Sequence, residues 1–202
     1  MSQKTEDLLS PGRKRKKSVI REWIDSLIIA FVLAMIIRIF IVEPFKIPTG
    51  SMRPTLLEGD IILVNKFVYG ARAPFIKFRL PGIHRPRRGD VVVFIYPLDE
   101  KKNFIKRLVA FGGETVEIKN GTIFVNDSPL LDPVFNQRYY YNRGDFAQEK
   151  QKIKIPKDSF FVMGDNSASS QDSRYWGFVP HKSIVGEATF IYWPPQRIRL
   201  IK

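Results

Sequence analysis

The chain has 202 residues, of which 44% are hydrophobic, and a formal net charge of +13 at pH 7. This apolar content excludes a disordered chain, and the length suits one ordinary domain with an appendage. Because the sequence holds no cysteine and only two histidines, disulfides and thiolate-bound metal centres are excluded, and we expect neither a metal nor another cofactor.

Residues 1–23 form a basic head. They hold seven Lys and Arg residues against three acidic residues, with the densest run at Arg13–Lys17. Such a run binds nucleic acid or an anionic membrane surface. Because an apolar segment follows directly, the membrane interpretation is favoured and no nucleic-acid partner is expected.

Residues 24–42 are predicted to form one transmembrane helix. The run from Leu27 to Ile37 is unbroken by polar residues, and the length is near the roughly 20 residues that cross a bilayer. Arg38 lies close enough to the end to extend its charge to the interface. A cleaved leader and a buried core helix are the alternatives, although no small-residue cleavage pattern follows the run. The positive-inside rule places the head in the cytoplasm and residues 43–202 across the bilayer.

Residues 43–202 are predicted to form a mainly β domain. Short β-branched runs are bounded by Gly, Pro, Asn and Asp at 60–68, 89–97, 115–127, 159–165 and 188–194. Within the third run, Asn120-Gly121 predicts a hairpin with a type I′ turn. The polar and aromatic stretch 130–157 is predicted to be an elaboration inserted between core strands.

Ser51 is a candidate nucleophile in the sequence "PTGSMRPTL", although an ordinary loop serine is the alternative. A nucleophilic serine needs an activating base. The two histidines, His84 and His181, lie in loop-like sequences and nothing pairs them with an acidic residue, so a Ser-His-Asp triad is not supported. A neutral lysine can take the place of histidine.

Lys106 is the candidate base, in the apolar stretch "NFIKRLVAFGG". Lowering the pKa of a lysine from about 10.4 to about 7 or 8 requires roughly 3 to 5 kcal/mol of environmental bias, which burial supplies. Strand alternation would place Lys106 on the same face as Phe104 and Leu108, with Arg107 on the opposite face. A lysine pointing outward from its strand is the alternative.

The stretch "GDNSASSQDSRYWGFVP", residues 164–180, has a high density of Gly, Asp, Asn and Ser directly after an apolar strand. A surface loop is the plain interpretation. Its aromatic end predicts that the loop is held against the domain. Asp172 and Arg174 are spaced to pair along one side of it.

Taken in order, the basic head, the apolar segment, "PTGSMRPTL", "GDIILVNK", "RGDVVVF", "FIKRLVAFGGETVEI" and "GDNSASSQDSRYWGFVP" resemble the bacterial type I signal peptidases, or leader peptidases. These enzymes remove signal peptides from exported proteins. The resemblance covers Phe45 to Pro194. It implies a Ser/Lys dyad in which Ser51 is the nucleophile and Lys106 the general base. The hydroxyl of Thr49 and the backbone N–H of Ser51 would form the oxyanion hole.

The resemblance also implies supporting residues and a fold. Ser170 would hydrogen-bond to Lys106 and orient it, the Asp172–Arg174 pair would brace the site, and Asp165 and Asn166 would shape the loop. The residues expected to line shallow substrate pockets are Phe45, Ile47, Met52, Leu56 and Ile105. The implied fold is a signal-peptidase-like β-rich catalytic domain with a variable second lobe at about 113–157. Some relatives have Arg and then Asp or Asn directly after "GDN", where this chain has residues 167–169, "SAS".

The expected function is therefore that of a membrane-anchored serine endopeptidase in the bacterial cytoplasmic membrane, with its catalytic domain on the extracytoplasmic side. Its expected partners are preproteins that carry signal peptides and the lipid bilayer, and a monomer is expected. Two alternatives remain at this point. One is a non-catalytic anchored β domain that binds a secretion partner or anionic lipid. The other is a Ser/Lys peptidase with a different substrate.

Overall fold

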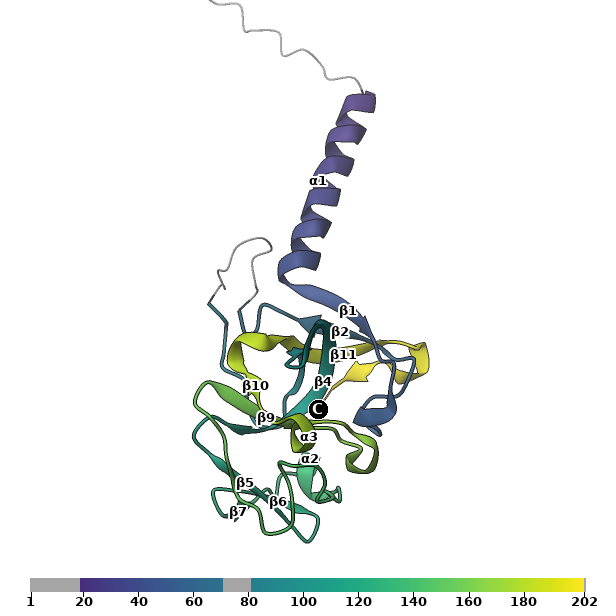
Figure 1. Ribbon diagram of the computed structural model, residues 1–202. Coiled ribbons are helices and arrows are strands. Elements are labelled where there is room, and N and C mark those ends of the chain that lie inside the picture. Colours follow the sequence, from purple (N-terminus) through teal and green to yellow (C-terminus); the bar gives the residue numbers. More distant parts are fainter. Residues whose placement is uncertain (1–18, 71–80, 202) are drawn as a thin grey trace, which may run out of the picture. The chain divides into compact units, whose positions relative to one another are not determined.

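The computed structural model describes residues 19–70 and 81–201 (Figure 1). The predicted basic head, apart from residues 19–23, therefore lies outside the described residues. The chain divides into two compact units, residues 1–36 and residues 37–202. Each unit is described separately below.

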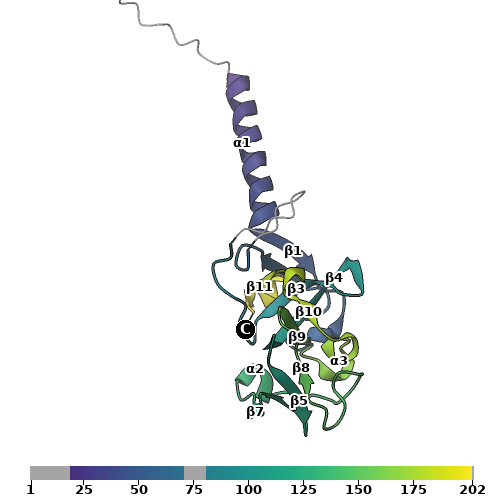
Figure 2. The same ribbon diagram turned by 60° about the vertical axis from the view of Figure 1, so that its left-hand side comes forward.

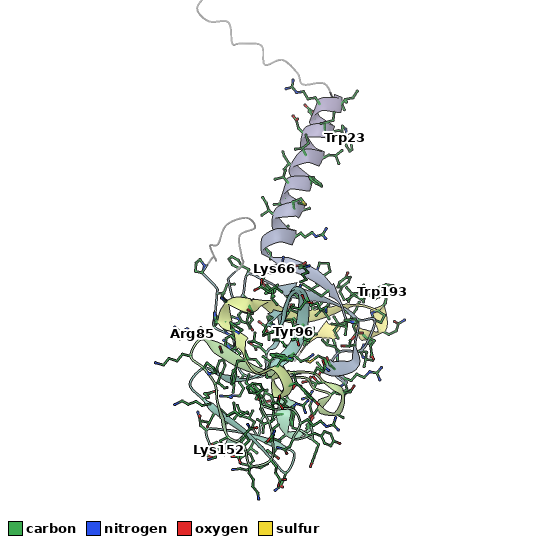
Figure 3. All side chains as sticks on the ribbon, viewed as in Figure 1. Trp23, Lys66, Arg85, Tyr96, Lys152 and Trp193 are labelled. Carbon is green, nitrogen blue, oxygen red and sulfur yellow. The ribbon has the colours of Figure 1, made fainter. Side chains whose placement is uncertain are left out.

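Helix α1 (Val19–Phe40) covers most of the predicted transmembrane segment, whose final residue, Val42, begins strand β1 instead. The large apolar side chains of α1 are exposed, and Leu27, for example, is 65% exposed. Figure 3 shows side chains such as Trp23 pointing outward from this helix. Within residues 19–70 and 81–201, no helix combines the length and the apolarity needed to cross a membrane.

The larger sheet of the second unit runs in the order β1-β2-β11-β3-β4-β9-β10, and β12 pairs with β11. Each of these pairs is antiparallel. The strands are β1 (Val42–Lys46), β2 (Ile61–Asn65), β3 (Val91–Tyr96), β4 (Asp99–Phe111), β9 (Ser159–Met163), β10 (Val179–Pro180), β11 (Ile184–Trp193) and β12 (Arg199–Leu200).

The smaller sheet builds the second lobe, defined here as residues 113–157. Its antiparallel order is β7-β6-β5-β8. The elements are β5 (Thr115–Lys119), β6 (Thr122–Val125), β7 (Ser128–Pro129), the short helix α2 (Pro133–Asn136) and β8 (Ile153–Lys154). The predicted hairpin is confirmed, because β5 and β6 pair across Asn120 and Gly121, whose φ angles are +49° and +78°. Figures 1 and 2 both show β5 and β7 on the far side of β9 from β1.

The mainly β character predicted from the sequence is confirmed, since a strand occupies each of the five predicted runs. The second lobe shares a core with the larger sheet. Val109 and Ala110 of β4 and Phe161 of β9 pack in the same buried cluster as Val116 and Ile118 of the lobe. This common core fixes the lobe against the strands that carry the candidate site.

Candidate active site

Ser51 lies in a 3₁₀ turn, η1 (Gly50–Met52), in the loop between β1 and β2. Two backbone hydrogen bonds close this loop at its base, from Ile47 N to Asp60 O (2.8 Å) and from Gly59 N to Ile47 O (2.9 Å). The side chain of Met52 is fully buried in the core, whereas Ser51 keeps 8% of its surface exposed. The turn is thus anchored by its apolar residue, and the neighbouring Ser51 lines a cleft.

Lys106 reaches this hydroxyl from β4, a strand flanked by β3 and β9. Its Nζ donates to Ser51 Oγ at 2.8 Å and to the carbonyl oxygen of Ile105 at 2.9 Å. The side chain is 4% exposed, and the amine lies 5.6 Å from the centre of the Phe104 ring. The structure therefore brings the two candidate catalytic groups into direct contact, 55 positions apart in the chain.

Burial lowers the pKa of Lys106 to about 8. The carboxylates of Asp172 and Asp165 act in the opposite direction and raise it, while the guanidinium of Arg174 lowers it. Because removal of the amine from water is the largest cause, the apolar cover of this site decides the protonation of the lysine. A substantial fraction of the amine is neutral near pH 8, as a general base requires.

A cleft of about 320 Å³ opens beside the two groups. Its lining includes Pro48, Thr49, Asn103, Phe104, Ile105, Ser169 and Gln171, together with Ser51 and Lys106. Thr49, the expected oxyanion donor, is exposed at this cleft. The arrangement leaves room for an extended peptide against the Ser51 hydroxyl.

A smaller pocket of about 40 Å³ adjoins the cleft, and Phe45, Ile47 and Ile105 are among its walls. Met52 and Leu56, which were expected to line substrate pockets, lie instead in the buried core with Ile62 and Val64. Both side chains are fully buried, so neither has an exposed surface in this structure.

The loop that follows β9 is held against the nucleophile turn. Asn166 N donates to Ser51 O (3.0 Å), and Asn166 Nδ2 donates to Gly50 O (3.1 Å). Gly164 lies at the point of closest approach, since a Cβ on it would fall 2.5 Å from Ser51 O and 2.1 Å from Ser170 Oγ. Any larger residue here would push the loop away from the turn.

Ser170 does not make the hydrogen bond to Lys106 that was expected of it. Its Oγ is buried and has no hydrogen-bond partner among the described residues. The hydroxyl faces Gly164, and the donors of Lys106 go to Ser51 and to the Ile105 carbonyl instead.

Asp172 and Arg174 form the expected pair, with Arg174 Nε 2.8 Å from Asp172 Oδ1 and both side chains fully buried. Asp172 also accepts from Gly164 N at 3.0 Å. Arg174 donates to Ser167 O (2.9 Å) and, in the second lobe, to Tyr141 O (2.9 Å). The pair therefore ties the beginning of the loop, its middle and the lobe together.

Asp165 has a partner that was not foreseen from the sequence. Arg107 donates to both of its oxygens, from Nε at 2.8 Å and from Nη2 at 2.7 Å. Strand alternation did place Arg107 opposite Lys106, and an arginine pointing into an apolar domain requires a carboxylate there. That requirement is the signal that could have identified the pair.

The two histidines do not belong to this arrangement. His84 and His181 line a separate groove of about 750 Å³ together with Tyr69 and Phe160. No group of three or more His, Cys, Asp or Glu side chains that could hold a metal ion occurs in the described part of the chain.

Comparisons with known proteins identify the family. Residues 20–193 match the family described as "Signal peptidase, peptidase S26". The chain is 35% identical over 217 residues to signal peptidase I of Pseudomonas fluorescens, which covers 91% of this chain and 76% of that protein. It is 36% identical over 198 residues to signal peptidase I P of Bacillus subtilis subsp. natto, covering 94% of this chain and 97% of that one.

A crystal structure of a signal peptidase I from Enterococcus faecalis V583 aligns with a TM-score of 0.45 and 30% identity, covering 54% of this chain and 100% of that one. A likeness at this score does not decide the fold. The family match spans most of the sequence, however, and the relatives agree with it. The chain therefore belongs to the signal peptidase family, peptidase S26, and is a peptidase, that is, a hydrolase.

Proposed function

We propose that this chain is a membrane-anchored serine endopeptidase that cleaves signal peptides from exported preproteins with a Ser51/Lys106 dyad. The observation that carries the proposal is the buried contact of 2.8 Å between Lys106 Nζ and Ser51 Oγ. A base within hydrogen-bond reach of a serine hydroxyl is the geometry that nucleophilic catalysis needs.

In the first step, the neutral amine of Lys106 accepts the proton of Ser51, and Oγ attacks the scissile carbonyl carbon. The resulting oxyanion is stabilised by the backbone N–H of Ser51 and the hydroxyl of Thr49. Lys106 then delivers its proton to the leaving amine, which leaves an ester between Ser51 and the signal peptide. In the second step Lys106 takes a proton from water as the water oxygen attacks the ester carbon. The bond from that carbon to Ser51 Oγ then breaks, Lys106 returns the proton to Oγ, and the signal peptide is released as its carboxylic acid.

The neighbouring buried ion pairs keep the Ser51 hydroxyl and the Lys106 amine in position. Asp165 and Asn166 hold the nucleophile turn, and the Asp172–Arg174 pair holds the loop that carries them. Such positioning residues act by orientation, and an error of about 1 Å can cost about 100-fold in rate.

The dimensions of the site favour small side chains before the cut. The pocket of about 40 Å³ beside Ile47 and Ile105 has room for a methyl group. A larger side chain would meet aliphatic walls, which are rigid in a well-packed domain. We therefore propose substrates with Ala at the first and third positions before the scissile bond.

Membrane anchoring is proposed from the apolar run Leu27–Ile37 and the positive charges that precede it. Side chains on this part of α1 are exposed in the described unit, and exposed apolar surface favours an apolar surrounding. The proposed location is the cytoplasmic membrane, with the catalytic domain on the extracytoplasmic side. A signal peptide in the same bilayer would meet Ser51 after a search in two dimensions.

The test uses the full chain in detergent and a preprotein with an Ala-x-Ala cleavage site. We expect the wild type to release the mature protein, and Ser51→Ala and Lys106→Ala to release none. Thr49→Ala should be slower by about 100-fold, the typical effect of losing one oxyanion donor. Lys102→Ala, which alters an exposed lysine of the same strand, is the matched control. Normal cleavage by either dyad variant would refute the assignment.

A further inference from the structure

We infer that Arg138, which the second lobe contributes, is a positioning residue for the nucleophile Ser51. This inference rests on the proposed dyad and adds a function for the lobe. Arg138 does not touch Ser51. It acts through its contacts with Asp165 and Thr55, which in turn hold the nucleophile turn.

Asp165 is the centre of a buried cluster. Its carboxylate is 1% exposed and receives Arg107 on both oxygens. Thr55 Oγ1 donates to Asp165 Oδ2 as well. A buried carboxylate with this many donors has one preferred position, because each displacement weakens several charge-assisted hydrogen bonds at once.

Arg138 joins the same cluster from the second lobe. Its Nη2 lies 3.2 Å from Asp165 Oδ2 and 3.1 Å from Thr55 Oγ1, and its side chain is 16% exposed. The backbone of Arg138 is fixed by a hydrogen bond from its N–H to the carbonyl of Phe135, a residue of the shared core. Residues 165–173 include no basic residue, so the loop itself supplies no positive charge to Asp165. The charge comes from Arg107 on β4 and from Arg138 in the lobe.

The cluster holds the nucleophile turn at both ends. At the N-terminal end, Asn166, the residue next to Asp165, donates to the carbonyls of Gly50 and Ser51. At the C-terminal end, Thr55 is bound to Asp165 and to Arg138. Loss of Arg138 therefore releases one contact on the loop and one on the turn.

Arg138 also adds a positive charge beside Asp165, in addition to that of Arg107. Asp165 is one of the two carboxylates that raise the pKa of Lys106, while Arg174 lowers it. Without the guanidinium of Arg138, the negative charge of Asp165 would act on the amine with less compensation. The amine would then hold its proton to a higher pH.

The experiment measures cleavage of a peptide substrate by the full-length protein and its Arg138→Met variant. Methionine keeps most of the apolar stem and removes all donors and the charge. We expect kcat to fall by about 10-fold or more, in line with the sensitivity of such sites to orientation, and KM to stay within about twofold. The acidic limb of the pH–rate profile should move to higher pH. Lys152→Met removes an exposed lysine of the same lobe, labelled in Figure 3, and should change none of these values.

Arg138→Lys restores the charge, so it should return the acidic limb to its wild-type position and recover much of kcat. Should Arg138→Met fail to fold, Arg138→Gln provides an uncharged side chain that can still donate, and the same shift of the limb is expected of it. Wild-type kcat and pH profile in the uncharged variant, with Ser51→Ala inactive, would overturn the inference and leave the proposed function intact. Normal activity of Ser51→Ala would instead overturn the proposed function.

Discussion

Replacement of Lys106 by methionine should make the protein inactive and, at neutral pH, more stable. Near pH 7 most of the folded chains carry a buried ammonium at this position, because the pKa is about 8. Its pKa in the unfolded chain is about 10.4, and each pH unit corresponds to 1.36 kcal/mol, so the folded state carries a penalty of about 3 kcal/mol. Methionine has a similar volume and no charge, and it removes this penalty.

The gain is reduced by the two hydrogen bonds that Lys106 gives, to the Ile105 carbonyl and to Ser51 Oγ, because the loss of each costs about 1 kcal/mol. The expected net stabilisation is therefore about 1 kcal/mol, or about 2 to 4 °C in Tm for a domain of this size. The sign depends on pH. From about pH 8 to 10.4 the unfolded chain keeps a proton that the folded chain has released, so the stability of the wild type rises with pH over this window. Above it, the variant should be the less stable protein by about 2 kcal/mol, because it lacks both hydrogen bonds.

Scanning calorimetry of both proteins in detergent at pH 7 and at pH 10.5 measures this difference. Lys102→Met is the control, because it removes an exposed lysine from the same strand, and its Tm should follow the wild type at both pH values. A Lys106→Met variant that melts at or below the wild-type temperature at pH 7 would refute the reasoning, since the buried charge would then carry no penalty.

Three further predictions concern the same site. The kcat/KM of the wild type should rise about tenfold per pH unit below pH 8 and level off above it, because only the neutral Lys106 accepts the proton; a profile that is flat from pH 6 to 8 would contradict this. Gly164→Ala should lower kcat by about 100-fold, because its Cβ would displace the carbonyl of Ser51, and peptide-cleavage kinetics at an unchanged KM would reveal it. Asp172→Asn should destabilise the domain by about 3 to 5 kcal/mol, measured by thermal melting, because it leaves the buried Arg174 without its counter-charge; a variant that melts like the wild type would exclude this role.

The elements with a local signal were predictable from the sequence. The β-branched runs that form β2 and β3 and the Asn120-Gly121 turn are determined by residues close together in the chain, and the structure contains all three. Strand β1 was not foreseen, because Val42 continues an apolar run and the strand is specified by its pairing with β2. The length of β4 was missed for the same reason, since its first part is polar and is held by pairing with β3.

The same distinction between local and distant signals applies to the candidate site. The apolar setting of Lys106 and the spacing of Asp172 and Arg174 are local, and the structure contains both. Contacts between distant residues left only an indirect trace. The position of Arg107 called for a carboxylate, but nothing near it in the chain identified Asp165, which is 58 positions away, as that partner. Apolar residues near a catalytic serine are ambiguous for another reason. From the sequence alone, Met52 fits a pocket wall and the hydrophobic core equally well. The structure places it in the core because of the way the turn packs.

The alternation along β4 limits how this part of the protein can change during evolution. Lys106 and Arg107 are adjacent, and their side chains serve Ser51 on one face of the strand and Asp165 on the other. A deletion of one residue just before them would move Arg107 to the face that Lys106 now occupies. The guanidinium, which has donors but no acceptor, would then occupy the place of the base. Length changes should therefore accumulate at the tip of the β3–β4 hairpin and be purged from the stretch that follows it.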